Sequence, residues 1–289
     1  MKICSACGSA FSHVGWLCPH CGIQPEERNG FTAFAPGLCS NAGFRDDHFN
    51  ELIELEARNF WFRARNRLIV WALLHYFPNK ENLLEVGCGT GFVLNGIASA
   101  FPKMKLSGSE ISSVGLAYAA KRLQNADLFQ MDARSIPFCN EFDVIAAFDV
   151  LEHIEEDETV LAQMYQAIRI DGGLMITVPQ HKFLWSRVDE HACHVRRYAA
   201  RDLVRKVKAA GFEIVRKTSF VSLLLPLMMA SRSLQRGENP NYDPLAELRI
   251  SDLPNNVFER IMAIERWAIR LGFSFPVGGS LLLIAKKIK

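Results

Sequence analysis

The chain has 289 residues, of which 49% are hydrophobic, enough for one α/β domain of ordinary size with small additions. Its 33 Lys and Arg residues and 31 Asp and Glu residues give a net charge of +2, which offers no overall electrostatic reason to expect nucleic acid, although local patches stay open. The first residues lack the apolar core of a secretory signal, and the longest apolar run, at 220–230, is too short to span a membrane. We therefore expect a cytoplasmic protein without a transmembrane segment.

Four cysteines near the N-terminus form two C-x-x-C pairs, Cys4 with Cys7 and Cys18 with Cys21. Four thiolates complete a tetrahedral Zn²⁺ site, and the glycine after each pair permits the turn that directs backbone N–H groups at sulfur. Residues 1–24 resemble a short zinc ribbon. Structural zinc is favoured over a redox dithiol because no strand–helix pattern surrounds the cysteines. The role of the ribbon stays open between binding a substrate, binding a partner and capping the domain.

Residues 25–45 are rich in Gly, Pro, Asn and Ser and predict a linker. The amphipathic pattern that follows, at 49–77, predicts one long helix that Pro78 ends. A dense group of aromatic and arginine side chains at 60–67 lies within it. One interpretation is that the aromatics pack the helix onto a sheet while the arginines are solvated.

The stretch 83–94, LLEVGCGTGFVL, has the pattern of a strand, a tight turn and a helix. The acidic Glu85 is followed by three glycines, Gly87, Gly89 and Gly91. Glycines let the backbone turn sharply and let a ligand approach it, and the start of a helix offers unpaired N–H groups. A dinucleotide fingerprint would need Gly or Ala where Phe92 stands. The pattern E-x-G-x-G-x-G resembles motif I of class I S-adenosylmethionine (SAM) dependent methyltransferases, where the acid and the turn hold the methionine end of SAM.

Further strands and helices are predicted to alternate along the chain. The strands are expected at 105–109, 126–131, 142–148, 174–178, 212–217 and 280–286, and the helices at 92–101, 112–124, 158–170 and 201–210. Glu110 ends the second strand 19 residues beyond Gly91, which suits a carboxylate that accepts hydrogen bonds from ribose hydroxyls. The resemblance implies that Asp132, with Ala133, contacts the adenine of SAM.

The stretch 142–154, FDVIAAFDVLEHI, carries a second resemblance, to the small-molecule and lipid methyltransferases that include ubiquinone-pathway enzymes. It covers roughly 82–215. It implies an α/β fold for residues 46–289, a Rossmann-like seven-stranded sheet with helices on both faces and a reversed last strand. It also implies that Phe148 and Asp149 lie at the cofactor. Helices before the first strand often act as lids in such enzymes, which makes Arg65 a candidate contact to an anionic acceptor.

The loop 181–198 follows a predicted buried strand, and open α/β sheets bind ligands beyond the carboxyl ends of their strands. Its pattern D-E-H-x-x-H-V-R-R-Y resembles a bacterial branch of these methyltransferases whose acceptors are mostly unassigned. Substrate contact is predicted for Trp185, Arg196, Arg197 and Tyr198. His153 is predicted to remove a proton from the acceptor, with His191 and His194 behind it. A metal bound by those two histidines with Asp189 is a weaker interpretation.

An insertion at 219–279, partly apolar and partly helical, precedes the last strand. It could form a wall of the acceptor pocket, a peripheral membrane contact or a dimer interface, and the oligomeric state stays open.

The leading hypothesis is a SAM-dependent methyltransferase that acts on a small-molecule or lipid-like acceptor. An rRNA methyltransferase with a zinc ribbon and a SAM-binding regulatory protein without catalysis are the alternatives. The chain lacks an N-P-P-Y or D-P-P-Y motif after the strand at 142–148, which disfavours methylation of amino groups on DNA.

Overall fold

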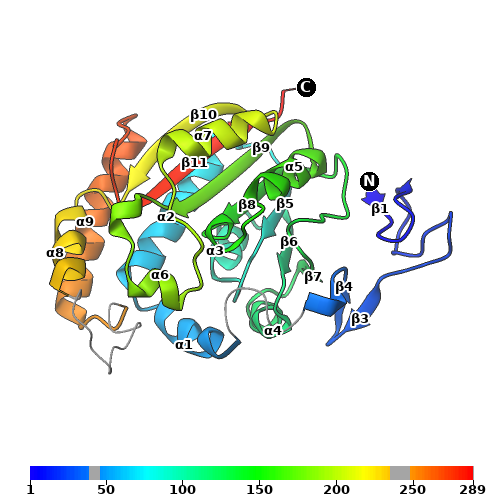
Figure 1. The fold of residues 1–289 in the computed structure, drawn as a ribbon, viewed down its shortest axis with the longest axis horizontal. Helices are drawn as coiled ribbons and strands as arrows, with labels where there is room; N and C mark the ends of the chain where they lie inside the picture. Colours follow the sequence, from blue (N-terminus) through cyan, green and yellow to red (C-terminus); the bar gives the residue numbers. More distant parts are fainter. Residues whose placement is uncertain (39–45, 235–247, 289) are drawn as a thin grey trace.

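A mixed nine-stranded sheet organises the protein in a computed structural model that describes residues 1–38, 46–234 and 248–288 (Figure 1). The order of its strands is β10-β11-β9-β8-β5-β6-β7-β4-β3. Their bounds are β3 Glu26–Arg28, β4 Phe31–Ala33, β5 Asn82–Val86, β6 Lys105–Glu110, β7 Ala126–Gln130, β8 Phe142–Phe148, β9 Ile168–Pro179, β10 Glu213–Phe220 and β11 Ser280–Lys286. A separate ribbon pairs β1 (Lys2–Ile3) with β2 (Ala10–Phe11).

The first seven strands in that order form the predicted methyltransferase-like sheet. Strands β9, β8, β5, β6 and β7 run parallel, so their carboxyl ends meet along one edge. Strand β11 lies antiparallel between β9 and β10, with Ser280 opposite Pro179 on one side and opposite Phe220 on the other. The prediction of a seven-stranded α/β sheet with a reversed last strand is confirmed.

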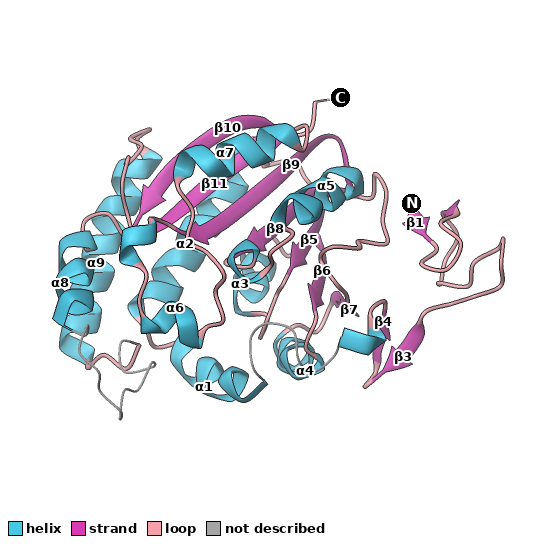
Figure 2. Ribbon diagram, in the orientation of Figure 1, coloured by secondary structure: helices cyan, strands magenta, loops and turns pink. Residues whose placement is uncertain are grey.

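Helices cover both faces of this sheet (Figure 2). Their bounds are α1 Asp46–Glu56, α2 Phe60–Tyr76, α3 Phe92–Ala100, α4 Ser113–Arg122, α5 Asp157–Ala167, α6 Arg187–His191, α7 Ala200–Ala209, α8 Leu225–Leu234 and α9 Asp252–Arg270, with 3₁₀ turns η1 Pro36–Leu38, η2 Leu151–His153 and η3 Lys182–Leu184. Side chains alternate between the two faces along each strand. Leu83 and Val144 pack in one core with α2, α3, α4 and α9, whereas Leu84 and Ile145 pack in the other with α5 and α7.

The prediction of a single helix over 49–77 is wrong. Helix α1 ends at Glu56, and Asn59 starts α2 with extended backbone and a side-chain oxygen that accepts the Trp61 N–H at 2.8 Å. This is the geometry of an N-cap, which breaks a continuous helix into two. The helix predicted over 158–170 also ends early, at Ala167, because Ile168 pairs with Phe142 at the start of β9.

The segment 25–45, predicted as a linker, contributes a hairpin to the sheet. Strand β4 pairs in parallel with β7, with Thr32 opposite Phe129. The side chain of Gln130 holds the next turn, since it donates to the Ala35 carbonyl at 2.8 Å and accepts the Ala35 N–H at 3.0 Å. Strands of three residues show too little periodicity for the sequence to reveal them. Residues 39–45 of the predicted linker lie outside the described residues.

The cysteine-bearing ribbon packs against the sheet beside β7, at the right of Figure 1. The ring of Trp16 contacts Phe34, Phe129 and Phe138, with centroids 4.5, 6.1 and 5.4 Å away. The Ile3 N–H donates to the Pro137 carbonyl at 2.9 Å. Aromatic contacts and backbone pairing therefore hold the ribbon to the domain.

No helix in the described ranges combines the length and the apolar character that crossing a bilayer requires.

Replacement of Trp16 by Ala tests this packing. We expect the Trp16→Ala variant to lose about 2 kcal/mol of unfolding free energy, less than a fully buried Trp, because the ring is only half-buried. The metal binding predicted for the four cysteines should stay unchanged, because the substitution does not touch them. Thermal unfolding and metal analysis would measure both, with Trp267→Ala, at a side chain 62% exposed, as the control. Equal stability of the two variants would contradict the described packing.

Candidate functional site

A cavity of about 670 Å³ lies at the carboxyl ends of β5, β6, β7 and β8. The glycine turn after β5 forms its floor. Its lining includes aromatic side chains from before the sheet, Phe49, Trp61 and Phe62, and residues of the short helix α6, Val188 and His191. This edge is where open α/β sheets bind their ligands, and the volume is in the range of small-molecule sites.

The glycine turn depends on its glycines. Gly87 has φ 69°, and a Cβ there would lie 2.5 Å from Cγ2 of Val150. Gly91 caps α3 with φ 75°, and a Cβ there would lie 3.0 Å from Cα of Ala119. Larger residues would displace the segment after β8 or helix α4, so the turn and its neighbours are packed as one unit.

Most residues predicted to bind the cofactor line this cavity. They are Glu85, Gly87, Gly89, Glu110, Asp132, Ala133, Phe148 and Asp149. The carboxylate of Glu110 accepts the Gly89 N–H at 3.0 Å and the Ile111 N–H at 2.8 Å, so it ties the end of β6 to the glycine turn. Gly91 is not part of the lining and acts as the helix cap.

Glu85 is a buried carboxyl group with an unmet hydrogen-bonding capacity. The residue is 2% exposed, and its Oε2 has no hydrogen-bond partner among the described residues. Burial raises its pKa to about 8, against the opposing charge of Arg65 and with reinforcement from Glu110. An ammonium group in the cavity would supply the missing charge and donor. The orphaned oxygen therefore fits the methionine amino group of SAM.

Arg65 lines the cavity, but its guanidinium is engaged by the protein itself. Its Nη2 lies 2.5 Å from Oδ2 of Asp149 and donates to the Phe148 carbonyl at 2.9 Å. Trp61 stacks on the guanidinium at 5.0 Å. Asp149 has φ 57°, a strained value for a residue with a Cβ, and the ion pair holds it there. Arg65 therefore shapes the site, and its Nε has no hydrogen-bond partner among the described residues. The predicted contact to an anionic acceptor stays a prediction.

Helix α1 is held over the cavity by a polar cluster that the sequence analysis missed. Glu56 accepts hydrogen bonds from the Thr90 hydroxyl at 2.7 Å and from the Arg122 guanidinium at 2.7 Å. Burial raises the pKa of Glu56, and Arg122 opposes that shift. The three residues come from α1, the glycine turn and α4. No local pattern signals such a cluster, because only the fold brings its members together.

The three predicted catalytic histidines, His153, His191 and His194, all line the cavity. The rings of His153 and His194 lie 4.7 Å apart. Burial, and then the neighbouring charge of His194, lower the pKa of His153 to about 3. An imidazole with so low a pKa is a weak base near pH 7, which disfavours the predicted order in which His153 came first.

Asp189 orients His194. Its Oδ1 lies 2.9 Å from Nδ1 of His194 and accepts the Nε–H of Arg197 at 2.6 Å. Burial alone would raise the pKa of this carboxyl, but its hydrogen bond to His194 and the charge of Arg197 lower it to about 2. The other oxygen, Oδ2, accepts the Ser186 N–H at 2.9 Å at the start of α6. One carboxylate therefore positions both the helix and the imidazole.

The four residues predicted to contact substrate in the 181–198 loop do not line the cavity. Arg197 binds Asp189 and the Gln180 carbonyl. Tyr198 donates to Asp157 at 2.6 Å, and Arg196 pairs with the same carboxylate at 2.7 Å. Trp185 is 38% exposed and donates to Glu190 at 3.3 Å. These contacts hold the loop in the shape that presents α6 to the cavity.

Residues 54–217, more than half of the chain, match the family described as "Methyltransferase domain". The chain belongs to this family. A probable S-adenosylmethionine-dependent methyltransferase of Mycolicibacterium smegmatis is 24% identical over 163 residues, which are 55% of this chain and 62% of that protein. A malonyl-[acyl-carrier protein] O-methyltransferase of Bacillus cereus is 26% identical over 102 residues, 35% of this chain and 38% of that protein.

The methyltransferase domain thus spans less than two thirds of the length of these curated relatives. A solved structure of a putative sarcosine dimethylglycine methyltransferase from Galdieria sulphuraria has a TM-score of 0.54 at 14% identity, over 77% of this chain and 85% of that one. The shared fold confirms the predicted class I methyltransferase architecture.

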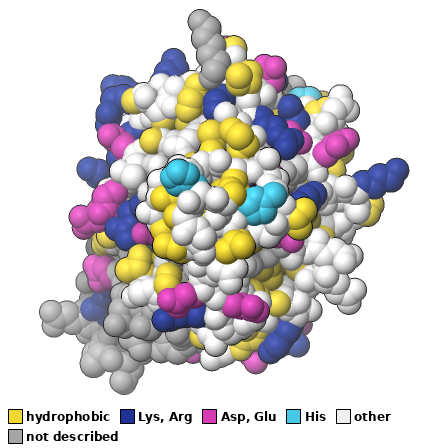
Figure 3. Space-filling model, turned by 90° about the vertical axis from the view of Figure 1, so that its right-hand side faces the viewer, with side chains coloured by type: hydrophobic (Ala, Val, Ile, Leu, Met, Phe, Trp, Pro, Cys, Tyr) yellow, Lys and Arg dark blue, Asp and Glu magenta, His cyan; other side chains and the backbone are white. Residues whose placement is uncertain are grey.

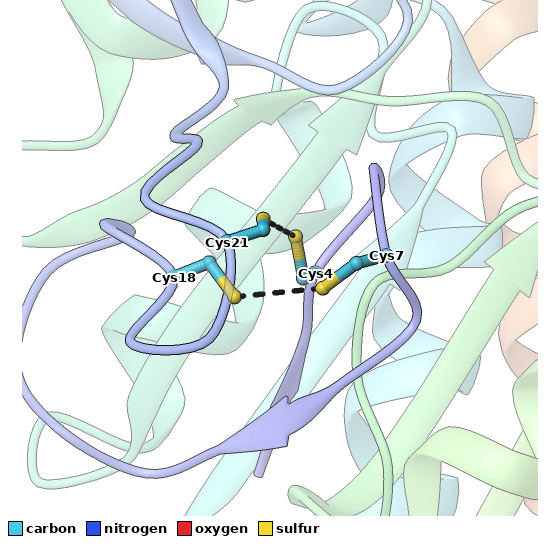
Figure 4. Close-up of side chains that lie close together, drawn as sticks. All are labelled: Cys4, Cys7, Cys18 and Cys21. Atoms are coloured by element: carbon cyan, nitrogen blue, oxygen red, sulfur yellow. Dashed lines mark hydrogen bonds between the residues drawn. The ribbon is translucent and has the colours of Figure 1, made fainter.

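The four N-terminal cysteines of the chain converge in space (Figure 4). The sulfurs of Cys4 and Cys21 lie 3.6 Å apart, and those of Cys7 and Cys18 lie 3.7 Å apart. In a tetrahedral site with Zn–S bonds of about 2.3 Å, neighbouring sulfurs are about 3.8 Å apart. The cluster therefore has the dimensions and the ligand chemistry of the predicted zinc site.

The Glu85→Gln variant should have opposite effects on the stability of the unliganded protein and on its affinity for SAM. Between pH 4.5 and about 8, folded Glu85 keeps a proton that the unfolded chain loses, so the free energy of unfolding falls as pH rises through this window. The amide of the Glu85→Gln variant does not titrate, so its free energy of unfolding does not fall in this way. We expect the unliganded variant to melt several degrees above the wild type at pH 8.5 but close to it at pH 4.5.

The same variant should bind SAM at least tenfold more weakly, because an amide cannot neutralise the ammonium group. Thermal scans at the two pH values and calorimetric titration with SAM measure the two effects. A variant less stable than the wild type at pH 8.5, or one with unchanged SAM affinity, would contradict this role.

Proposed function

We propose that this chain transfers the methyl group of SAM to a small-molecule or lipid-like acceptor in the cavity described above. One observation carries the proposal: the glycine turn, the acidic side chains and the three histidines all line the same cavity. The first two sets suit the cofactor, and the third suits an acceptor that must lose a proton.

The order of the strands supports an orientation for both ligands. Asp132 follows β7, Glu110 ends β6 and Glu85 lies on β5, which suits adenine, ribose and the methionine end of SAM in turn. Beyond β5 come β8 and β9, followed by His153 and by the loop with His194. In this arrangement the acceptor lies on the β8 side of the cavity, where the methionine end and its sulfonium would face it.

Methyl transfer from SAM requires no covalent bond between the protein and either reactant. The nucleophile forms its bond to the methyl carbon as the bond from carbon to sulfur breaks, and SAM leaves as S-adenosylhomocysteine. Holding the two reactants in line can supply roughly 7–11 kcal/mol in favourable cases. The cavity imidazoles can take the proton of a hydroxyl or ammonium acceptor, which typically adds a factor of about 10²–10⁴. The walls formed by Phe49, Trp61 and Phe62 would exclude water.

The acceptor is inferred to be small and partly apolar because the cavity has a volume of about 670 Å³ and its lining includes aromatic side chains and residues of α6. The malonyl-[acyl-carrier protein] O-methyltransferase among the relatives is compatible with a small acceptor. On the face that carries the ribbon, basic and acidic side chains are interspersed (Figure 3), so the charge pattern there does not favour the rRNA alternative. We also propose that Cys4, Cys7, Cys18 and Cys21 hold a structural Zn²⁺ ion.

Glu110→Ala tests the cofactor end. Removal of the carboxylate should weaken SAM binding at least tenfold, because both the ribose contact and the tie to the Gly89 N–H are lost. Calorimetric titration measures the affinity. Asp127→Ala is the matched control, since this neighbouring acid is exposed and pairs only with Lys105 at 3.6 Å among the described residues. Unchanged affinity in Glu110→Ala would refute the proposed geometry.

The acceptor class is open to direct measurement. Purified protein and methyl-labelled SAM would be incubated with cell extract, which is then separated into RNA, protein, lipid and small-molecule fractions. We expect label in the lipid or small-molecule fraction. Label confined to RNA would overturn the proposed acceptor in favour of the rRNA alternative, and SAM binding without transfer to any fraction would favour a regulatory protein.

A further inference from the structure

Three side chains at the acceptor end of the cavity form a cluster that the proposed methyl transfer does not require. Their potential ligand atoms, a carboxylate oxygen of Glu152 and one ring nitrogen each of His153 and His194, all lie within 4.8 Å of one another. Both histidines line the cavity, whereas Glu152 lies behind them. Two of the residues come from the turn after β8 and the third comes from the loop after α6.

Glu152 is the unusual member of the cluster. It is fully buried, and neither carboxylate oxygen has a hydrogen-bond partner in the described part of the chain. The two arginines whose charges act on it are engaged elsewhere, Arg65 with Asp149 at 2.5 Å and Arg197 with Asp189 at 2.6 Å. Burial, and then the negative charge of Asp149, raise the pKa of Glu152, so the group keeps a proton when no cation is bound. A bound cation would favour the carboxylate form by taking the place of that proton.

Each histidine is held through contacts outside the cluster. Nδ1 of His194 is 2.9 Å from Oδ1 of Asp189, which leaves Nε2 to face another ligand. His153 forms hydrogen bonds with the backbone of Ala192 and Cys193. Metal-binding histidines characteristically have one ring nitrogen held by a carboxylate or a backbone carbonyl while the other binds the ion.

We propose that Glu152, His153 and His194 bind one divalent transition-metal ion at the acceptor end of the cavity. Atoms that bind one ion through bonds of about 2.1 Å lie roughly 3 Å from one another. Side-chain rotations that move the ligand atoms by about an ångström each would bring them to this spacing. Two imidazoles and a carboxylate suit Mn²⁺, Fe²⁺, Co²⁺ or Zn²⁺ and leave coordination positions open. The sequence offered a metal site made of His191, His194 and Asp189 as a weaker interpretation. In the site proposed here the carboxylate ligand is Glu152, and Asp189 only positions His194.

The open positions face the cavity, because His153 and His194 line it. An ion there would hold an acceptor through an oxygen atom and favour loss of its hydroxyl proton. This extension rests on the proposed function, and it narrows the acceptor to an oxygen nucleophile. In this arrangement His191, which also lines the cavity, would receive the proton.

Metal titration of the full-length, zinc-loaded protein tests the site without an activity assay. Mn²⁺ binding would be followed by the loss of the electron paramagnetic resonance signal of free Mn²⁺, and Co²⁺ binding by calorimetry. Thiolates bind Mn²⁺ poorly, so the cysteine cluster should contribute little to the first titration. We expect one equivalent of bound metal in the wild type.

Three variants assign the site. Glu152→Gln and His194→Gln should each lower the affinity at least tenfold, whereas His191→Gln, in the same cavity but outside the cluster, should change it less than twofold. SAM affinity and thermal stability of each variant would show that it is folded. Absence of Mn²⁺ and Co²⁺ binding in the wild type, or equal binding in all four proteins, would overturn the metal site.

Failure of this inference can be told apart from failure of the proposed function. Methyl transfer by a wild-type protein that binds neither metal would leave the proposed function standing and refute the metal site. Metal binding at the cluster by a protein that does not bind SAM would support the metal site and refute the proposed function. Methyl transfer that rises with bound Mn²⁺ in the wild type, and not in Glu152→Gln, would support both.

Discussion

The acidic edge of the sheet depends on one buried cation, Arg65. Several carboxyl groups meet where the parallel strands end, and the charge of Arg65 acts on Glu56, Glu85 and Glu152 while its guanidinium pairs with Asp149. Burial raises the pKa of those three acids despite this charge. Burial therefore favours the protonated form of these acids, and a bound cation would favour their ionised form. Such a site is poised for cationic ligands, and SAM carries both a sulfonium and an ammonium group.

The same ion pair explains how the helix before the sheet takes part in the site. Arg65 reaches from α2 to the end of β8, and the Glu56, Thr90 and Arg122 cluster joins α1 to the glycine turn and α4. Both contacts are polar and buried, so each specifies one position for its helix more sharply than apolar packing alone. The wall formed by Phe49 and Trp61 follows from these two anchors. Helix α6, which also contributes to the lining, is anchored in the same manner by Asp189.

The two ends of the cavity differ in the kind of group that they present. The proposed cofactor end offers carboxylates and the glycine turn, whereas the proposed acceptor end offers imidazoles beside buried acids. Asp189 is satisfied by Arg197, His194 and the start of α6, whereas Glu152 has no comparable set of donors. Two buried acids so close together and so differently satisfied suggest different tasks, one structural and one reserved for a ligand.

The sequence by itself determined the sheet, the glycine turn and the residues at the ends of the strands. Apolar runs, glycines and acids such as Glu85 and Glu110 are local signals, and parallel strands necessarily bring their carboxyl ends together. The cysteine pairs are equally local, and their sulfurs converge as the spacing predicts. The histidines at 153, 191 and 194 were also found from the sequence, because each follows a recognisable strand.

Only the tertiary structure decided how the remaining polar residues are used. Arg65, Arg197 and Tyr198 have the composition of a substrate site in the sequence, but acids of the protein engage them. Asp149 and Asp157, which pair with Arg65 and Tyr198, lie far along the chain, whereas Asp189, which pairs with Arg197, lies eight residues away. The break at Asn59 and the hairpin at β3 and β4 escaped detection because a cap and three-residue strands leave little periodicity. The sequence shows Glu152 directly before His153. Only packing leaves its two carboxylate oxygens without a hydrogen-bond partner in the described chain. Charge pairing and burial depend on distances between segments remote in sequence, and those distances exist only once the chain has folded.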